Sequence, residues 1–538
     1  MKFLTAAEMK QADQATVEKF GGNFTALMEN AGAAVARFVR LQWPQAKRVV
    51  VICGKGNNGG DGSVAARLLV DAGIAVTVML LADPAKLQGE AARNFRKLAV
   101  DTLVVMDEAA LASASAAAKF AAADVILDAV YGTGFRPPLD ALALAVKKLL
   151  DERSVPVVAV DLPSGWDADS REAKAEAFRA DAVVTFTAPK IAHAFGDMTG
   201  GAMVVAEIGS PEEAIVGASC LSWTGAATAK FQVPRDRNGN KGQYGHVLIV
   251  GGARGKAGAP SMSSLASMRV GAGLTTAAVA GSILSTVAMV APELITAELE
   301  ETADGALSAA NSTSASWKAL LEKKTVLAMG PGLGTANETK KFVHSVVANR
   351  EVPLVLDADG LNAFAGQTEK LNGSRHTLVL TPHPGEMARL LGSTVKAVEG
   401  DRENIARKFA TDHELILVLK GWRTLVAHPD GRLAVNLTGN PGMAKGGSGD
   451  VLTGLVAGML AQAKAYGATD GEAVEAAVYL HALAADMAVA AGDEHCFLPT
   501  DLLAWLPRTF RFHNDSDSGF RWLRGFSAAT TGVARWRE

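Results

Sequence analysis

A glycine-rich loop that ends in one carboxylate carries the clearest chemical signal in the sequence. The loop reads NPGMAKGGSGD from Asn440 to Asp450, and residues 451–460 continue with the apolar spacing of a helix. Glycines let the backbone turn sharply and present its N–H groups, and a helix N-terminus attracts anions. The stretch therefore predicts a phosphate site at the start of a helix.

Asp450 itself has two interpretations, because a carboxylate beside a bound phosphate is repelled by it. As a helix N-cap, Asp450 would accept a hydrogen bond from the first helical turn, a role that aspartate often fills. As a general base, it would take the proton of a hydroxyl group that is about to receive a phosphoryl group. The other polar loops of the chain bear on this choice.

The elements that must position these loops follow a parallel α/β pattern, in which short apolar runs rich in β-branched residues alternate with helical patterns. In the first half, strands are expected at 49–53, 76–81, 125–128, 157–161, 183–187 and 204–208. In the second half they are expected at 246–250, 274–280, 325–329, 354–357, 378–381 and 415–420, with weaker strands at 424–427 and 433–437.

The domain boundaries follow from two stretches in which this pattern lapses. A polar segment at 222–240, punctuated by glycine and proline, separates the halves, so the domains are expected at 1–222 and 228–510. Residues 511–538 lose all periodicity and are expected to form a poorly ordered tail of unknown role. Removal of residues 516–538 is therefore expected to leave function intact.

The composition excludes several classes of protein. Of the 538 residues, 49% are hydrophobic and 20% are charged, and the formal net charge is −3. Since no basic excess or cluster of Lys and Arg is present, nucleic-acid binding is not expected. An uncharged run at 270–292 is long enough to span a bilayer, but it is rich in Gly, Ser, Thr and Ala. We interpret it as a buried helix–strand–helix and expect no membrane partner.

Three cysteines, Cys53, Cys220 and Cys496, are too few and too scattered for a disulfide framework or a zinc site. The N-terminus turns polar too early for a signal peptide. A cytoplasmic location is therefore expected.

Three polar loops follow strands in the first half. The loop CGKGNNGGDG at 53–62 has the glycine spacing of a dinucleotide-binding loop, yet it crowds Asn57, Asn58 and Asp61 where such loops are mostly small or apolar. The second loop, LDAVYGTGFRPP, begins with Asp128, and the third, DLPSG, begins with Asp161. Amide and carboxylate oxygens suit a hard cation as well as a ribose. Because ligands sit at the carboxyl ends of strands in open α/β sheets, the three loops predict one site.

Polar loops again follow strands in the second half. GPGLG at 330–334 exposes backbone, TPHPGE at 381–386 holds His383 between two prolines, and KGWRT at 420–424 places Lys420 at a strand end. Together with the loop that ends at Asp450, they predict a site for a nucleotide and a second phosphorylated ligand. This context favours the interpretation of Asp450 as a base.

Taken together, the motifs resemble one known family. CGKGNNGGDG, LDAVYGTGFRPP and DLPSG are similar to the NAD(P)H-hydrate epimerase domain, and GPGLG, TPHPGE, KGWRT and NPGMAKGGSGD are similar to the ADP-dependent NAD(P)H-hydrate dehydratase domain. The resemblance covers about residues 5–510 and points to the bifunctional NAD(P)H-hydrate repair enzymes. It implies an N-terminal Rossmann-like α/β/α sandwich and a C-terminal ribokinase-like α/β domain.

For the N-terminal domain, the resemblance implies interconversion of the R and S hydrates of NADH and NADPH, which carry a hydroxyl group at C6 of the nicotinamide ring. Asp161 would be the catalytic base. A potassium ion would be held by Asn58, Asp128 and Ser164. The hydrate would contact Asn57, Asn58, Gly59, Gly60, Asp61, Gly132, Thr133, Gly134, Phe135, Arg136, Pro137, Pro138 and Asp161.

For the C-terminal domain, the resemblance implies that ADP phosphorylates the hydroxyl group of the S hydrate, with Asp450 as the base. Loss of phosphate would restore NAD(P)H and leave AMP. The hydrate would contact Ala259, Gly332, His383 and Asp450, and the adenine nucleotide would contact Lys420, Gly421, Trp422, Arg423, Thr424 and Gly449. A magnesium ion is expected to neutralise the transferring phosphate. A homo-oligomer is also expected.

Two other classes of function stay open. A dehydrogenase that used the loop at 54–59 would need a hydride-transfer site, and no His/Asp or Tyr/Lys constellation is evident near that loop. Alternatively, the N-terminal half is a ligand-binding or scaffolding module without catalysis, attached to a kinase-like domain.

Overall fold

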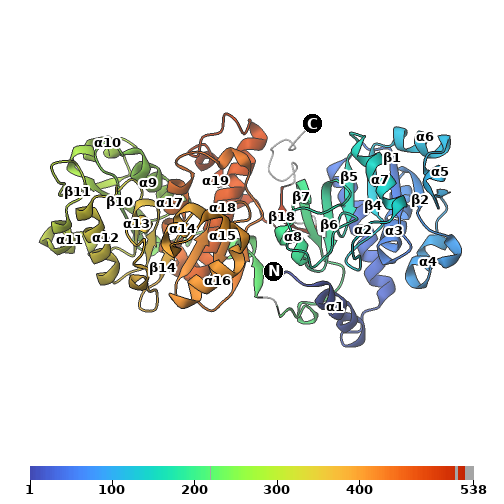
Figure 1. Cartoon of the computed structure of the whole chain (residues 1–538), viewed down its shortest axis with the longest axis horizontal. Coiled ribbons are helices and arrows are strands. Elements are labelled where there is room, and N and C mark those ends of the chain that lie inside the picture. Colours follow the sequence, from blue (N-terminus) through green and yellow to red (C-terminus); the bar gives the residue numbers. More distant parts are fainter. Residues whose placement is uncertain (219, 515–518, 527–538) are drawn as a thin grey trace. The chain divides into compact units, whose positions relative to one another are not determined.

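The computed structural model describes residues 1–218, 220–514 and 519–526, which fold into two compact units (Figure 1). Unit 1 consists of Met1–Ser219 together with the C-terminal segment that begins at Asn514, and unit 2 is built on Cys220–His513. Each unit has its own sheet, and in both sheets most neighbouring strands are parallel. The α/β class predicted from the sequence is therefore confirmed.

The sheet of unit 1 has eight strands in the order β18-β7-β6-β5-β4-β1-β2-β3. Their bounds are β1 Arg48–Cys53, β2 Ala75–Leu80, β3 Asp101–Val104, β4 Val125–Ala129, β5 Val157–Val160, β6 Ala180–Phe186, β7 Thr199–Ala206 and β18 Phe520–Arg524. The six strands predicted for this half are present. β3 was not predicted, because this edge strand is half-exposed and only its last two residues are apolar.

The helices of unit 1 connect these strands. They are α1 Ala6–Glu18, α2 Phe24–Gln42, α3 Asn57–Asp71, α4 Gly89–Arg96, α5 Glu108–Leu111, α6 Ala114–Ala122, α7 Ala141–Asp151 and α8 Ile191–Phe195. α3 follows β1 directly, so the residues of the first polar loop form the first turns of a helix at the carboxyl end of that strand. α2 packs along α3 at Gly32, where an added Cβ would lie 2.4 Å from Val64.

The expectation that residues 511–538 form a poorly ordered tail was wrong for part of that stretch. Within it, β18 pairs antiparallel with β7, and its Phe520, Trp522 and Leu523 side chains are buried. The Phe520 and Trp522 rings contact the ring of Phe38 on α2 at centroid distances of 5.6 and 6.2 Å. Residues 515–518 and 527–538 of the predicted tail lie outside the described residues.

The sheet of unit 2 has ten strands in the order β11-β10-β9-β12-β13-β14-β15-β16-β17-β8. Their bounds are β8 Leu221–Trp223, β9 His246–Val250, β10 Leu274–Ala280, β11 Ile295–Leu299, β12 Val326–Met329, β13 Leu354–Leu356, β14 Leu378–Leu380, β15 Ile416–Leu419, β16 Leu425–Ala427 and β17 Leu433–Val435. All eight predicted strands are present, whereas the short strands β8 and β11 were not predicted. The start of the polar segment at 222–240 belongs to this sheet, because β8 pairs with β17.

The helices of unit 2 include the one predicted after the glycine-rich loop. They are α9 Gly258–Val270, α10 Leu284–Ala288, α11 Ala315–Leu321, α12 Asn337–Asn349, α13 Ala358–Asn362, α14 Pro384–Leu391, α15 Val395–Gly400, α16 Arg402–Asp412, α17 Ser448–Gln462, α18 Asp470–Ala491 and α19 Leu502–Arg511. α17 lies directly against α9, since an added Cβ at Gly454 would stand 2.1 Å from the carbonyl oxygen of Ser263.

Among the described residues, one helix, α18, is long and apolar enough to cross a membrane, and 94% of its most apolar window is buried inside the protein. It is a core helix of unit 2, packed against α17 and α19. The uncharged run at 270–292 forms the end of α9, the strand β10 and the helix α10, as predicted.

Candidate active sites

In unit 1, the carboxylate of Asp161 lies at the centre of a buried network. Asp161 follows β5 in a left-handed conformation with φ of 70°. Its Oδ1 accepts hydrogen bonds from Lys190 Nζ at 2.7 Å and Thr185 Oγ1 at 2.8 Å. Its Oδ2 accepts from the backbone N–H of Thr133 at 2.8 Å and from Thr133 Oγ1 at 2.5 Å. Both oxygens of this carboxylate are therefore fully engaged.

This network fixes the charges of its members. Burial would raise the pKa of Asp161, but the ammonium group of Lys190 and the hydrogen bond from Thr133 hold it below its ordinary value. Burial and the charge of Lys190 lower the pKa of His193 to about 4, so this ring is neutral at pH 7. The site thus holds a buried Asp161–Lys190 ion pair.

Lys190 is a site residue that the sequence reasoning missed. Its side chain is only 2% exposed and makes a 2.7 Å ion pair with Asp161. It lies just before α8, in the loop that follows β6. No recognised motif surrounds it. Ligands gather at the carboxyl ends of strands, and we applied this rule to β1, β4 and β5. The same rule applied to β6 would have included Lys190.

The three predicted potassium ligands lie close together in unit 1. The backbone N–H of Ser164 donates to Asp128 Oδ2 at 2.7 Å, and Ser164 Oγ donates to Asp128 Oδ1 at 2.6 Å. An added Cβ at Gly132 would lie 2.9 Å from Asp161 Oδ2 and 3.1 Å from Asn58 Oδ1, which places Asn58 beside Asp161. The loops after β1, β4 and β5 therefore converge at one site, as predicted.

A cation fits this ligand set. Asp128 is fully buried, and no lysine or arginine in the described part of the chain forms an ion pair with it. Burial raises its pKa to about 6. Asn58 is 8% exposed, and its amide nitrogen has no partner among the described residues. A buried carboxylate with hydroxyl and amide oxygens nearby is the oxygen chemistry that hard cations prefer.

The remaining residues predicted to contact the hydrate occupy two segments. Asn57, Asn58, Gly59, Gly60 and Asp61 form the first turns of α3, and Gly132, Thr133, Gly134, Phe135, Arg136, Pro137 and Pro138 form the loop after β4. The Phe135 ring stacks on Tyr131 at 4.7 Å. Arg136 is exposed and forms ion pairs with Asp167 at 3.2 Å and Asp169 at 3.3 Å, so it lies at the rim.

In unit 2, a lysine and several carboxylates gather at the carboxyl ends of β13, β14 and β15. Lys420 Nζ lies 2.8 Å from Asp357 Oδ1 and 3.7 Å from Glu386 Oε2. Thr453 Oγ1 on α17 donates to Asp357 Oδ2 at 2.7 Å. Burial would lower the pKa of Lys420, but Asp357 and Glu386 raise it above its ordinary value. Lys420 is therefore a fixed positive charge.

Asp450 lies beside this cluster but does not cap its helix. α17 begins after Gly447, which occupies the N-cap position in a left-handed conformation, and Asp450 is the third helical residue. The capping interpretation of Asp450 is therefore wrong. Its neighbour Gly449 approaches Lys420 so closely that an added Cβ would lie 3.3 Å from the ammonium nitrogen.

The surroundings of Asp450 raise the pKa of its carboxyl group toward neutral pH. Burial and the negative charge of Asp357 raise its pKa to about 6, against the opposing charge of Lys420. Within the described residues its carboxylate accepts no hydrogen bond, whereas its backbone oxygen accepts one from Ser263 Oγ at 2.7 Å. A carboxylate with an unused lone pair and a pKa near neutrality can accept a proton.

The residues predicted to contact the hydrate in unit 2 lie in three loops. Gly332 has φ of 69°, and an added Cβ there would lie 3.3 Å from Ala259 Cβ, so these two residues are neighbours. His383 is the N-cap of α14, where its Nδ1 accepts from the backbone N–H of Gly385 at 3.0 Å. Its Nε2 lies 3.5 Å from Glu386, which also approaches Lys420. The structure thus connects His383 with the Lys420 cluster.

The loop predicted to bind the nucleotide presents an aromatic plane. Trp422 is 51% exposed, and the guanidinium group of Arg423 stacks on its ring at 4.6 Å. Arg423 is buried in a left-handed conformation and donates to the carbonyl oxygen of Leu437 at 3.2 Å. Thr424 Oγ1 donates to the carbonyl oxygen of Gly421 at 3.0 Å. Arg423 therefore holds the loop in shape, while Trp422 faces solvent.

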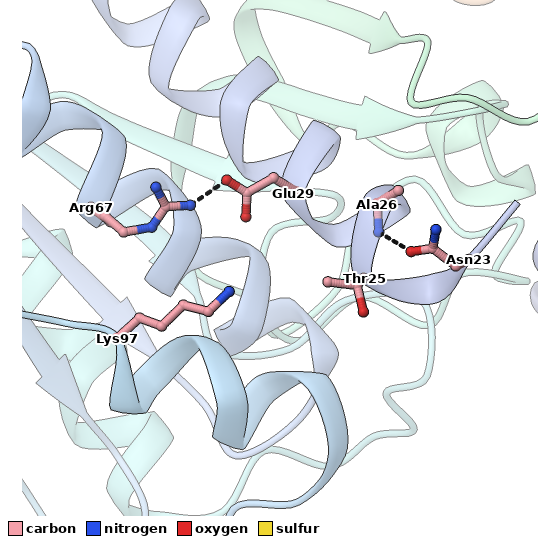
Figure 2. A pocket seen from close by; sticks show the side chains of 6 residues that line it. All are labelled: Asn23, Thr25, Ala26, Glu29, Arg67 and Lys97. Carbon is pink, nitrogen blue, oxygen red and sulfur yellow. Dashed lines mark hydrogen bonds and ion pairs between the residues drawn. The ribbon is translucent and has the colours of Figure 1, made fainter.

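A cavity of about 650 Å³ lies away from these groups (Figure 2). It is lined by residues of α2, of α3 and from just beyond the end of α4, namely Asn23, Thr25, Ala26, Glu29, Arg67 and Lys97. Figure 2 shows Arg67 paired with Glu29, and the backbone of Ala26 bonded to the Asn23 side chain that caps α2. None of the predicted site residues lines this cavity.

The family model described as YjeF-related protein N-terminus matches residues 25–192, and the one described as NAD(P)H-hydrate dehydratase matches residues 247–508. The bifunctional NAD(P)H-hydrate repair enzyme of Moorella thermoacetica is 40% identical over 527 residues, which cover 95% of this chain and 97% of that protein. The Escherichia coli protein of the same name is 34% identical over 524 residues, which cover 94% and 93%.

Among solved structures, the ADP/ATP-dependent NAD(P)H-hydrate dehydratase of Bacillus subtilis, co-crystallised with ATP and Mg²⁺, is 30% identical with a TM-score of 0.47. The match covers 54% of this chain and 97% of that one. The two full-length relatives align with nearly the whole chain, and the two family models match its two halves in the predicted order. This chain belongs to the family of bifunctional NAD(P)H-hydrate repair enzymes.

Proposed function

We propose that unit 1 interconverts the R and S hydrates of NADH and NADPH, and that unit 2 dehydrates the S hydrate at the expense of ADP. The observation that supports the second activity best is the position of Asp450, an unbonded carboxylate in the first turn of α17 and close to the half-buried Lys420. Family membership supports the pairing of the two activities in one chain.

In unit 2, Asp450 takes the proton of the C6 hydroxyl group, while the oxygen of that hydroxyl group attacks the β-phosphorus of ADP. The bond from that phosphorus to the bridging oxygen breaks and AMP leaves. Lys420 and the backbone N–H groups at the start of α17 stabilise the transferring charge. Departure of phosphate from C6, with loss of a proton from C5, then forms the C5=C6 bond of NAD(P)H.

A magnesium ion fits the acidic surplus around Lys420, where Asp357, Glu386 and Asp450 outnumber the one lysine. Within the described residues no group of three His, Cys, Asp or Glu side chains is arranged to hold a metal ion by itself. Magnesium commonly takes only one or two carboxylates and completes its shell with phosphate oxygens and water. Asp357 and Glu386 would hold it, and it would neutralise phosphate charge.

In unit 1, Asn58, Asp128 and Ser164 would hold a potassium ion, which would supply a fixed positive charge beside the hydrate. Asp161 stays our proposed catalytic residue at C6, with Lys190 fixing its charge and direction. The start of α3 and the loop after β4 would bind the hydrate on either side of that carboxylate.

A turnover assay on the separately purified R and S hydrates, with ADP and ATP compared, tests the proposal. We expect the S hydrate to yield NAD(P)H and AMP with ADP, and the R hydrate to react at a rate limited by epimerisation. Redox turnover of ordinary NAD(P)H would favour a dehydrogenase instead. Failure to accelerate epimerisation of the R hydrate would favour a module without catalysis in unit 1.

We also propose a cytoplasmic location and a homo-oligomeric assembly. The three cysteines are free thiols, with Cys53 buried and Cys220 and Cys496 exposed, which supports a reducing compartment. Light scattering on the purified chain tests the assembly, and fractionation of the cells that make it tests the location.

A further inference from the structure

An arginine outside the recognised motifs binds the backbone of the KGWRT loop. Arg402 is the first residue of α16, and its side chain is 15% exposed. Its Nη2 donates to the carbonyl oxygens of Leu419 at 3.2 Å, Lys420 at 3.3 Å and Arg423 at 3.3 Å. Three main-chain carbonyl groups, from the end of β15 and from the loop that follows it, therefore meet at one guanidinium group.

The backbone of this loop is shaped to receive the guanidinium group. Gly421 has φ of 133°, a conformation that favours glycine, and an added Cβ there would lie 2.6 Å from Arg402 Nη1. Arg423 also lies in the left-handed region, with φ of 58°. Arg402 Nη1 lies 3.4 Å from the carboxylate of Glu399, which pairs its charge. The close approach therefore depends on the glycine at 421 and on the guanidinium group at 402.

The same contacts decide where two N–H groups of the loop point. The peptide bonds of the loop are trans, and in a trans peptide the N–H points opposite to the C=O. The carbonyl group of Lys420 faces Arg402, so the N–H group of Gly421 in the same peptide faces away from it. In the same way, the carbonyl contact of Arg423 turns the N–H group of Thr424 away. Within the described part of the chain neither N–H group donates a hydrogen bond.

These two donors lie beside the other groups predicted to bind the nucleotide. Gly421 follows Lys420, whose ammonium group would lie 3.3 Å from an added Cβ at Gly449, in the loop that ends at Asp450. Gly421 and Trp422 are exposed, so the loop is open to a ligand. Backbone N–H groups gathered on one side of a loop bind anionic oxygen atoms. The phosphate groups of ADP supply such oxygen atoms.

We propose that Arg402 is a positioning residue for ADP. It holds the loop so that the N–H groups of Gly421 and Thr424 donate to the nucleotide, which Arg402 itself does not touch. This inference rests on the proposed ADP-dependent dehydration in unit 2. It assigns a role in nucleotide affinity to α16, an element in which no motif was recognised.

The position of Lys420 does not depend on Arg402 alone. The ammonium group of Lys420 is held by Asp357 at 2.8 Å, and its backbone N–H donates to the carbonyl oxygen of Pro382 at 2.9 Å. Loss of the Arg402 side chain should therefore release the loop beyond Lys420 and leave the positive charge of Lys420 in place. The expected effect is on the binding of ADP and not on the chemical step.

The test is the Arg402→Met variant of the full-length chain, assayed with the S hydrate at varied concentrations of ADP. Methionine keeps an apolar stem but donates no hydrogen bond. Since each of the two N–H bonds to ADP contributes up to about tenfold in affinity, the KM for ADP should rise by about 5- to 100-fold. The kcat at saturating ADP and the KM for the S hydrate should stay near the parent values. Calorimetric titration with ADP alone should show the same loss of affinity.

Two further variants keep the test decisive. Arg402→Lys keeps the positive charge but lacks the planar fork that reaches the carbonyl groups, so it should also weaken ADP binding. Arg407→Met is the matched control, because Arg407 lies on the same helix and donates to the carbonyl oxygen of Gly431, in the turn between β16 and β17. This control should leave the KM for ADP unchanged.

Three results would overturn the inference: parent affinity for ADP in Arg402→Met, a fall in kcat with an unchanged KM for ADP, or an equal rise of that KM in Arg407→Met. Thermal unfolding checks that each variant is folded. If Arg402→Met does not fold, the same constants measured on Arg402→Lys decide. A parent chain that does not convert the S hydrate with ADP would instead contradict the proposed function of unit 2.

Discussion

Asp161 is a buried carboxylate after a strand and Asp450 a half-buried one at the start of a helix, and their neighbours move their pKa values in opposite directions. Around Asp450 the carboxylates outweigh Lys420, and its pKa rises to about 6. Asp161 accepts four hydrogen bonds, one of them from Lys190, and its pKa falls. The first arrangement suits a group that accepts a proton during the reaction, and the second suits a group that keeps a charge in place.

We expect Asp450→Asn to reduce dehydration of the S hydrate by about 10²–10⁴-fold, because the amide cannot accept the hydroxyl proton. Nucleotide binding should persist or tighten, since a negative charge beside the phosphate is removed. The melting temperature should stay near that of the parent, because Asp450 is not the helix cap. Calorimetric nucleotide binding and NAD(P)H formation measure the two effects. Dehydration at the parent rate would exclude Asp450 as the base.

The pH dependence of dehydration should report the same residue. Because its pKa is raised to about 6, Asp450 is protonated and inactive as a base below that pH. The dehydration rate should therefore rise as the pH increases through about 6 and then level off. An initial-rate profile between pH 4.5 and 8, in steps of about half a unit, checks this, and a flat profile in the parent would contradict it.

Asp161→Asn should abolish epimerisation and also destabilise unit 1. Removal of one partner of a buried ion pair typically costs about 3–5 kcal/mol, because the remaining charge is left without a partner. Lys190 would be that charge, and it is only 2% exposed. The variant Asp161→Asn with Lys190→Met should recover part of this stability but no epimerisation. Thermal unfolding of both variants separates the two effects, and full epimerisation in either would remove Asp161 from the site.

Glycines on α17 set the distance between α17 and α9 and hence the position of the loop that ends at Asp450. An added Cβ at Gly454 would lie 2.1 Å from Ser263 O, and one at Gly458 would lie 2.4 Å from Val270. Gly454→Ala should therefore push the two helices apart and lower both the rate of dehydration and the stability of unit 2. Epimerisation, which belongs to unit 1, should persist. Gly400→Ala in α15, where nothing lies within 4 Å, is the matched control and should leave both activities unchanged.

The sequence predicted the elements well where apolar runs are continuous and buried, as in β5 and β15. It failed where a strand is short or half-exposed, as in β3 and β8, because such strands lack a long apolar run and their partners are distant in sequence. The polar loops at strand ends were predictable because parallel strands bring their carboxyl ends to one edge. Lys190 was missed because no motif surrounds it, although the same rule applied to the end of β6 would have included it.

The chain leaves unit 1, builds unit 2 and then returns to unit 1 with β18. Arg37 stacks on the Phe520 ring at 4.6 Å, and Arg524 donates to the carbonyl oxygen of Thr199 at 2.8 Å. Deletion of residues 514–538 should therefore lower the stability of unit 1, because the loss of the buried Trp522 alone is worth about 3–5 kcal/mol.

This deletion should reduce epimerisation more than dehydration, in contrast to the harmless truncation expected from the sequence. A chain that ends at Phe526 retains β18 and serves as the control, with parent-like activities expected. Differential scanning calorimetry of the two truncated chains, beside the parent, measures the change. Equal melting profiles for all three chains would show that β18 contributes nothing to unit 1.

The place of β18 in the chain also has a consequence for biosynthesis. Arg521 of β18 forms an ion pair with Glu207, the residue just after β7, although the two stand 314 positions apart in the sequence. At roughly 5–20 residues per second, a ribosome needs about 15–60 s to make that interval. During this time the β7 edge of the nascent unit 1 is without its partner, and an unpaired edge can recruit other strands. A circular permutant that begins at Cys220 encodes β18 before β7, so β7 would meet its partner as soon as it is made, and this chain should give a higher yield of soluble protein.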